Sequence, residues 1–225
     1  MIITQTLFNI NHNNFNKHIN KSKKFGSYSP AEYLYSEIIN FKGWIFTKKY
    51  LILIYVALKA WNMNSRAAKL VSFKDFRESI YRNRKLLRIM LQFHKINDIR
   101  RIMLNFNGTG SISNINQMFQ VLESLFNNLS LTVTGTKLVT FSKVMHFMFP
   151  KLIVPIDRKY TLTFFRNSVY VPTSMSAQFK YFKLIHISFF HFASVYDLSN
   201  YINHNLPFFA THTKIIDNLI IGSLS

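Results

Sequence analysis

Leu131–Asp157, LTVTGTKLVTFSKVMHFMFPKLIVPID, is the stretch that decides the fold and carries the strongest indication of function. It contains a glycine turn, a helical pattern that opens at Lys137, a proline that ends the helix, and a short apolar run that ends in the carboxylate of Asp157. The chain of 225 residues has only 9 acidic residues against 28 lysines and arginines, so this aspartate is a scarce group. Apolar surroundings raise the pKa of a carboxylate and nearby cations lower it, which makes such a group adjustable for chemistry.

Apolar side chains at three- and four-residue spacing continue on both sides of this stretch and predict helices. Strict alternation of apolar and polar residues, which would indicate strands, is rare. We therefore predict a mostly α fold, a compact domain of about 8–10 helices. Two lobes around a central cleft are one arrangement that such a domain can adopt. The predicted helical segments are residues 30–40, 47–61, 72–93 with a break near 82–83, 113–126, 159–167 and 174–193, followed by two short C-terminal helices of which the second begins after 207 and ends before 222.

The chain divides into two parts by composition. Residues 1–28 are rich in Asn, Lys and Ser with little periodicity, and they predict a basic, flexible arm. Residues 29–225 predict a single α-helical domain, because no linker or internal repeat divides them. The near-continuous apolar face of 47–61 predicts a central helix.

The net charge of +19 indicates the class of partner. A domain with this charge repels itself unless a polyanion is near, so nucleic acid is the first expectation and an anionic membrane surface the second. The longest apolar runs, Tyr50–Leu58 and Ile185–Tyr196, fall short of the roughly 20 residues that cross a bilayer. The start, MIITQTLFNINHNN, lacks a secretory signal, so an intracellular location (cytoplasm or nucleoid) is expected.

Most other kinds of chemistry lack the residues that they need. Cysteine is absent, which excludes disulfides and thiolate catalysis. The eight histidines do not show the spacing of a zinc protease, and no phosphate loop ending in Gly-Lys-Ser/Thr occurs. We expect no metal and no cofactor.

The opening stretch resembles the helix-hairpin-helix DNA glycosylase superfamily, which includes the 8-oxoguanine glycosylases and endonuclease III. That family has a Leu-Pro-Gly-Val-Gly-x-Lys hairpin, a helix, and then a Val-Asp reached through an apolar loop. Leu131, Gly135, Thr136 and Lys137 match the hairpin's Leu, second Gly, variable residue and Lys, and Val154–Asp157 resembles the loop with the essential Asp. Thr and Val stand where the family has its Pro and first Gly, and the resemblance covers about 27 residues of 225.

The resemblance implies a base-excision enzyme, a DNA glycosylase with or without lyase activity, acting on duplex DNA with a damaged or unpaired base. Such enzymes flip the base into a pocket, because its glycosidic bond cannot be reached inside the stack. Asp157 would then stabilise positive charge on the sugar or activate the attacking group, and Lys137 would be the amine nucleophile. Contacts to the nucleic acid would come from Gly135, Thr136, Lys143, Arg158 and Lys159. Candidates to stack on the extruded base are Phe141, His146, Phe149 and Trp61.

Simpler interpretations of the same residues stay open. Lys137 could be a solvated lysine in the first turn of a helix, and Asp157 could cap the helix that follows. The chain could also be a non-enzymatic basic protein that binds nucleic acid through an all-helical scaffold. A third alternative is a peripheral membrane or partner-binding protein that uses aromatic-rich amphipathic helices such as residues 180–196.

Overall fold

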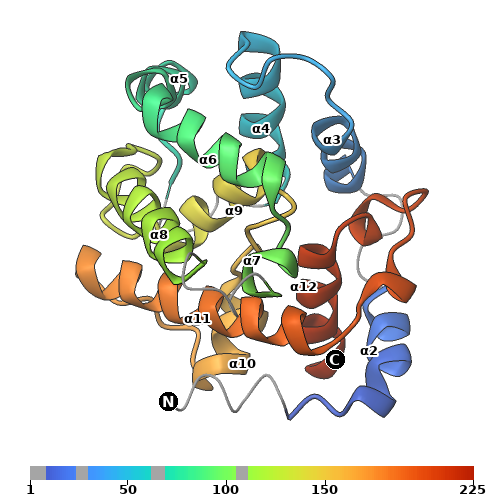
Figure 1. Cartoon of the computed structure of the whole chain (residues 1–225). Coiled ribbons are helices and arrows are strands. Elements are labelled where there is room, and N and C mark those ends of the chain that lie inside the picture. The colour runs from blue at the N-terminus through green and yellow to red at the C-terminus, as the bar shows by residue number, and fades with distance from the viewer. Residues whose placement is uncertain (1–8, 24–29, 62–68, 105–110) are drawn as a thin grey trace.

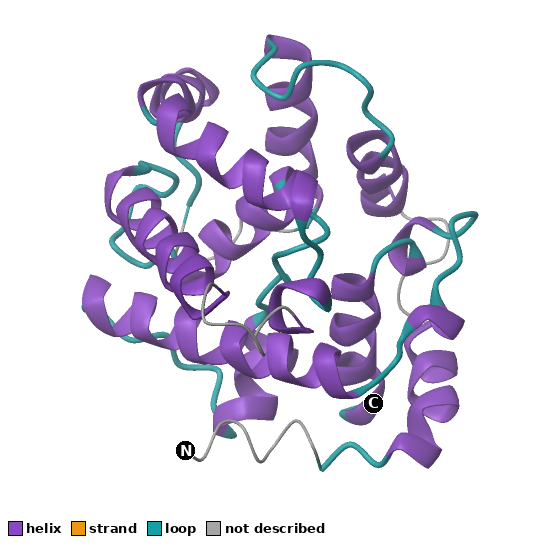
Figure 2. Cartoon of the chain, viewed as in Figure 1, coloured by secondary structure: helices purple, strands orange, loops and turns teal. Residues whose placement is uncertain are grey.

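The protein is described here by a computed structural model, which covers residues 9–23, 30–61, 69–104 and 111–225. Within these ranges every regular element is helical, and extended pairing is limited to an isolated antiparallel bridge between Leu70 and Thr132 (Figure 2). The prediction of a mostly α fold is confirmed. None of the described helices combines the length and the hydropathy that crossing a membrane requires.

The helices pack around one another without forming layers (Figure 1). The α-helices are α2 (Phe15–Ser22), α3 (Pro30–Ile39), α4 (Lys48–Ala60), α5 (Phe73–Arg82), α6 (Arg84–Ile96), α7 (Arg101–Leu104), α8 (Ser111–Asn128), α9 (Leu138–Met148), α10 (Thr163–Arg166), α11 (Met175–Val195) and α12 (His212–Ser223). Short elements of other helix types are the 3-10 turns η1 (His12–Asn14), η5 (Ser199–Tyr201) and η6 (Pro207–Phe209) and the π turn η4 (Arg158–Leu162).

Several helix ends lie where capping chemistry places them. Thr47, Ser72 and Ser174 each accept a hydrogen bond from a backbone N–H in the first turn of α4, α5 and α11. The predicted break near residues 82–83 is present as the boundary between α5 and α6, where Asn83 ends one helix and precedes the next. Gly222 was expected to lie beyond the last helix, but α12 continues through it.

The centre of the fold is α9, the helix of the opening stretch. All of its residues are buried, including Lys143 and His146, whereas α4 exposes Ile52 and Val56 on its outer side. The predicted apolar face of α4 is buried, but α9 is the more completely enclosed of the two helices. Sequence periodicity describes one apolar face, but it does not reveal that neighbouring helices cover the opposite face as well.

The aromatic residues of α11 lie inside the molecule. Phe182, Phe189, Phe190 and Phe192 are fully buried, and Phe182 packs edge-on against Phe141 of α9. The aromatic side chains of this segment therefore contribute to the core, and they are not presented to a membrane.

The described part of the N-terminal segment is folded. Phe15 and Ile19 are buried, and α2 lies against α12, the last helix of the chain (Figure 1). His18 Nδ1 lies 3.1 Å from the carbonyl oxygen of Gly222, and Lys21 Nζ donates to the carbonyl of Ser225. The prediction of a flexible arm is wrong for residues 9–23; residues 1–8 and 24–28 of that arm lie outside the described ranges.

Replacing Gly222 is expected to separate these two helices. A methyl group on Gly222 would lie 1.9 Å from the carbonyl oxygen of His18, and backbone cannot move aside as a side chain can. We expect Gly222→Ala to lower the free energy of unfolding by about 3 kcal/mol, at the upper end of overpacking costs, as measured by urea denaturation. Gly135→Ala is the matched control, because its methyl group would meet nothing within 4 Å. Equal midpoints for the two variants would contradict the prediction.

Candidate active site

The apolar run before Asp157 is held from one side by a buried histidine. His146 of α9 is fully buried, and its Nδ1 lies 2.6 Å from the carbonyl oxygen of Ile153. Because a carbonyl can only accept, Nδ1 carries the proton, and Nε2 accepts from the Tyr35 hydroxyl at 2.9 Å. Burial lowers the pKa of His146 to about 3, with a smaller contribution from the Lys214 ammonium. A neutral imidazole in one tautomer therefore fixes the loop.

Two further buried groups complete this support. The Ile156 N–H donates to Ser142 Oγ of α9 at 2.9 Å. His186 of α11 lies between two carbonyl oxygens, that of Phe182 at 2.9 Å from Nδ1 and that of Val154 at 3.2 Å from Nε2, and the neutral ring donates to one of them. Hydrogen bonds from α9 thus fix the backbone up to the residue before Asp157, and the carboxylate has a defined position.

The Asp157 carboxylate has two separate roles. One oxygen, Oδ1, accepts from the Lys159 N–H at 2.7 Å, and the Asp157 N–H donates to Thr161 Oγ1 at 3.0 Å, so the residue caps η4. The other oxygen, Oδ2, lies 3.6 Å from Lys143 Nζ. The capping interpretation is confirmed, and it leaves the second oxygen directed at an ammonium group.

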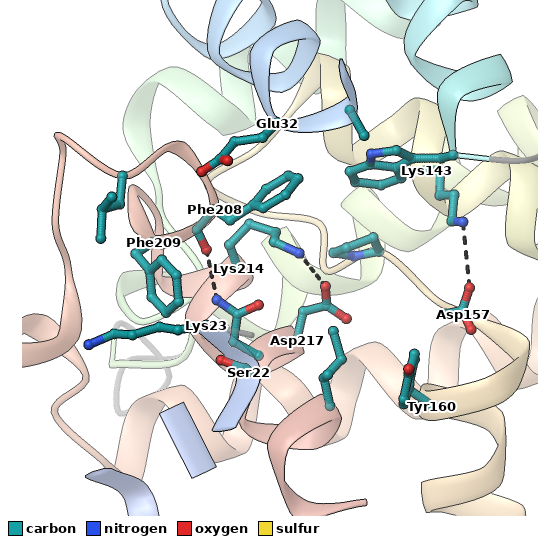
Figure 3. A pocket seen from close by; sticks show the side chains of 16 residues that line it. Ser22, Lys23, Glu32, Lys143, Asp157, Tyr160, Phe208, Phe209, Lys214 and Asp217 are labelled. Atoms are coloured by element: carbon teal, nitrogen blue, oxygen red, sulfur yellow. Dashed lines mark hydrogen bonds and ion pairs between the residues drawn. The ribbon is translucent and has the colours of Figure 1, made fainter. Parts of the chain in front are cut away.

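This ion pair lies in a cavity of about 380 Å³. Its walls come from six parts of the fold: the end of α2, the start of α3, the end of α4, Lys143 of α9, the loop and turn around Asp157, and η6 with α12 (Figure 3). Its lining residues are Ser22, Lys23, Ala31, Glu32, Trp61, Lys143, Pro155, Asp157, Tyr160, Leu206, Phe208, Phe209, Lys214, Asp217, Asn218 and Ile221.

A second ion pair stands beside the first. Lys214 Nζ and Asp217 Oδ2 are 2.5 Å apart, and both side chains are buried. The ring of Trp61 has the Lys143 ammonium 5.2 Å from its centroid and the Lys214 ammonium at 5.7 Å, while Phe208 lies 5.0 Å from Lys214. Both cations therefore contact aromatic faces in the cavity wall.

The pKa of Asp217 depends on its burial and on the three charged groups around it. Burial raises the pKa of Asp217 above its usual value, and the Lys214 ammonium offsets only part of this effect. The negative charge of Asp157 also raises it, whereas Lys143 lowers it. The four groups form one electrostatic unit of two cations and two carboxylates, which we call the charge quartet (Figure 3).

The structure does not bring Lys137 to this cavity. Lys137 Nζ donates to the carbonyl oxygens of Leu129 at 3.0 Å and Asn127 at 3.4 Å, and it lies 5.2 Å from the centroid of Phe126. It therefore caps the C-terminal end of α8, and burial lowers its pKa to about 8. The expected pairing of Lys137 with Asp157 is wrong, because the amine beside Asp157 belongs to Lys143.

The turn at Gly135 and Thr136, which was expected to contact nucleic acid, is bonded to a side chain of the protein. The N–H groups of Lys137 and Leu138 both donate to Gln178 Oε1, at 2.9 and 3.0 Å, and Gln178 Nε2 donates to the carbonyl of Gly135 at 3.0 Å. Two amides that would face a phosphate at the start of α9 are thus already bonded. Thr136 beside them is half-buried, and neither it nor Gly135 lines the cavity.

Of the four stacking candidates, only Trp61 lines the cavity. Phe141, His146 and Phe149 are fully buried in the core, where no base could stack on them. Their placement in the pocket was wrong, because α9 is covered on all sides.

The three basic residues that were expected to contact nucleic acid lie in different places. Lys143 was expected at a phosphate, but it lies inside the cavity in the charge quartet. Lys159 is exposed and lies 5.2 Å from the ring centroid of Tyr160, a cavity residue, and Arg158 is half-buried next to it. These two lie near the cavity as a phosphate contact would require.

Sequence reasoning missed Lys214 and Asp217. A signal was present in HTKIIDNLII, where a lysine and an aspartate three positions apart interrupt an apolar helix. Residues at this spacing share a helix face, so a charged pair within an apolar pattern indicates a buried ion pair. Phe208 and Tyr160 carried no such signal, because the chain is rich in aromatic residues throughout.

No protein-family model, curated protein or solved structure matches the chain. Among the described residues, no group of three or more His, Cys, Asp or Glu side chains could hold a metal ion. The site is therefore interpreted from its own geometry.

Removing the Lys137 ammonium is expected to destabilise the fold. Lys137→Met keeps the length of the side chain but loses the bonds to two carbonyls at the end of α8. Hydrogen bonds from charged groups contribute about 1.5–3 kcal/mol, and we expect a loss of that order in thermal or urea unfolding. Lys159→Met is the control, because its side chain is exposed. An unchanged stability of Lys137→Met would show that the cap is unimportant.

Proposed function

We propose that the chain is a base-excision enzyme of the DNA glycosylase type, and that the cavity with the charge quartet receives the extruded base. The observation that carries the proposal is the position of Asp157. Its Oδ2 is directed into a cavity that has aromatic walls, in a protein of net charge +19. A cationic protein binds the phosphate backbone, and an aromatic cavity suits a planar base removed from the stack.

The proposed role of Asp157 is electrostatic. Breaking the bond between base and sugar develops positive charge on the sugar, and a fixed carboxylate stabilises that charge. Water then forms the new bond to the sugar carbon, its proton passes to Asp157, and the base leaves with the electron pair of the broken bond. Hydrogen bonds to the preceding loop hold the carboxylate in position, so little reorganisation is needed.

The arrangement favours hydrolysis over a lyase step. A Schiff base requires a neutral amine, whereas Lys143 and Lys214 are paired with carboxylates. The third cavity lysine, Lys23, is exposed to water at the end of α2. The amine whose pKa is lowered to about 8, Lys137, caps α8 and does not line the cavity. We therefore propose that Lys143 orients Asp157 and that no covalent adduct forms with the sugar.

A panel of duplexes that carry damaged or mismatched bases tests this function. We expect release of a base from at least one duplex and a loss of about 100-fold or more in Asp157→Asn, the size found when a charge-stabilising group is removed. Asp197→Asn is the control, because that carboxylate is also paired with a cation, Arg100, but is exposed and does not line the cavity. Borohydride should trap no adduct. Absence of excision on every duplex would refute the proposal.

A second candidate is nucleic-acid binding without chemistry. It is favoured by exposed basic residues of α5 and α6, namely Lys74, Arg82, Arg84, Lys85 and Arg88. This candidate predicts binding that weakens steeply with salt and is unchanged in Asp157→Asn. It would remain if binding occurs and no base is released.

A further inference from the structure

An exposed loop beside the cavity presents two apolar side chains. Residues 167–172 connect α10 to the segment before α11, and within them Val169 is 50% and Tyr170 55% exposed. Val171 is buried and anchors the loop. We call Val169 and Tyr170 the apolar tip.

The backbone of this tip is held rigidly. Arg158 Nε donates to the Val169 carbonyl at 3.0 Å, and Arg166 Nη1 donates to the Tyr170 carbonyl at 2.9 Å. Asn167 adopts the left-handed conformation (φ 50°) that ends α10, a conformation that asparagine tolerates better than most residues. The loop thus has an ordered backbone and leaves the side chains of Val169 and Tyr170 exposed.

An aromatic side chain that stays exposed on an ordered loop is available for contact with a partner. Burying a tyrosine gains free energy in proportion to the apolar area removed from water, so an exposed one is available to a partner. Because the tip is already ordered, a partner would not have to supply the free energy of ordering it.

The charge around the tip selects the partner. The chain from Arg158 to Tyr196 contains no aspartate or glutamate, while it contains Arg158, Lys159, Arg166, Lys180 and Lys183. Within the described part of the chain, no carboxylate forms an ion pair with Arg158, Lys159 or Arg166. The Arg166 guanidinium lies 4.2 Å from the ring centroid of Tyr181, which leaves a cation stacked next to the loop.

The tip is bonded to η4, the turn that contributes Tyr160 to the cavity wall. Arg158, which holds Val169, directly follows Asp157, and Tyr160 of the same turn lines the cavity wall. A strand whose phosphates contact Arg158 and Lys159 would therefore pass Tyr170 as it reaches the cavity mouth.

We propose that the apolar tip is a stacking platform for a single-stranded segment of nucleic acid, with Tyr170 under a base and with Arg158 and Lys159 on the flanking phosphates. Alternating aromatic faces and cations are the chemistry by which proteins hold unpaired bases, and each stacked base contributes about 1–3 kcal/mol. The proposal shares with the proposed function a nucleic-acid partner, but it requires no bond to be broken.

Equilibrium binding of an undamaged fluorescent single-stranded oligonucleotide tests the platform, with the full chain. We expect Tyr170→Ala to weaken binding by about 5- to 100-fold while the slope of log affinity against log salt stays the same. Lys159→Gln should weaken binding less and reduce that slope by about 0.7, the contribution of one phosphate contact on a single strand. Far-ultraviolet circular dichroism and the unfolding midpoint would confirm that each variant is folded.

Tyr33→Ala is the matched control, because Tyr33 is also an exposed tyrosine, at 66%, and lies on α3 away from the tip. Its binding should equal that of the parent chain. Equal losses in Tyr170→Ala and Tyr33→Ala, or an unchanged affinity of Tyr170→Ala, would overturn the platform. Tighter binding to anionic vesicles than to the oligonucleotide, lost in Tyr170→Ala, would also overturn it and assign the tip to a membrane surface. Failure of base excision would refute the proposed function and leave this result intact.

Discussion

Acidification from pH 6.5 to about 4.5 is expected to lower the free energy of unfolding by several kcal/mol. Burial lowers the pKa of His94 to about 4, of His146 to about 3 and of His186 to about 4, from an ordinary value of 6.5. Between these values the unfolded chain binds protons that the folded chain does not. Stability is therefore complete above pH 6.5 and falls as the pH drops, by up to about 1.4 kcal/mol per pH unit for each histidine.

Burial is the main cause of these shifts, and the hydrogen bonds of His146 and His186 to backbone carbonyls oppose it. His94 Nε2 accepts from the Lys151 N–H at 3.3 Å, and His146 Nε2 accepts from Tyr35, so protonation of either ring removes an acceptor. The Lys151 and Lys214 ammonium groups also oppose a charge on His94 and His146. Asp217 acts in the opposite direction, because its pKa is raised and it takes up a proton in the folded state more readily than in the unfolded state.

Urea unfolding at half-unit steps from pH 7 to pH 4.5 measures this dependence. The range stays above the ordinary pKa of most carboxylates, so the histidines dominate it. His146→Gln should reduce the slope by the contribution of one histidine, at a cost in stability at pH 7. A free energy of unfolding that is constant from pH 6.5 to 4.5 would contradict the prediction.

Breaking one half of the buried Lys214–Asp217 pair is expected to have the second large effect. Lys214→Met leaves the buried Asp217 carboxylate without its nearest cation, and removal of one partner of a buried pair costs about 3–5 kcal/mol. The double variant Lys214→Met/Asp217→Leu removes both charges and should recover much of this loss, since well-packed apolar residues often replace such a pair at little cost.

Double-mutant unfolding at pH 7 measures the coupling, with Asp217→Leu completing the cycle. A second readout is pH. Without Lys214 the pKa of Asp217 should rise further. As the pH falls and this carboxyl becomes protonated, Lys214→Met should therefore regain stability relative to the parent chain. If the double variant loses as much free energy of unfolding as the two single variants together, the pair does not act as a unit.

Local features were predictable because they depend on neighbouring residues. Apolar spacing placed the helices, and the break between α5 and α6 was predicted at Asn83, where both helices meet. The capping role of Asp157 followed from an acceptor side chain before a helical turn. Each of these features requires only a few consecutive residues of the chain.

The members of the site were harder to predict because they come from distant parts of the chain. Lys137 and Lys143 stand six positions apart, and the sequence favoured the first as the partner of Asp157 on the resemblance to a hairpin. Tertiary packing directs Lys137 to the end of α8 and Lys143 into the cavity. Lys214 approaches the same cavity from the C-terminal helix, which no local pattern links to α9.

By itself the sequence determined the all-helical class, the strong positive charge and the position of a scarce carboxylate at the end of an apolar run. Only the tertiary structure decided that α9 is enclosed on every side, that α2 closes the fold against Gly222, and that two lysines and two aspartates share one cavity. The physical reason is that helix periodicity depends on contacts within about four residues. Burial and the direction of a side chain depend on which distant helices pack together, and pKa depends on the charges that they bring close.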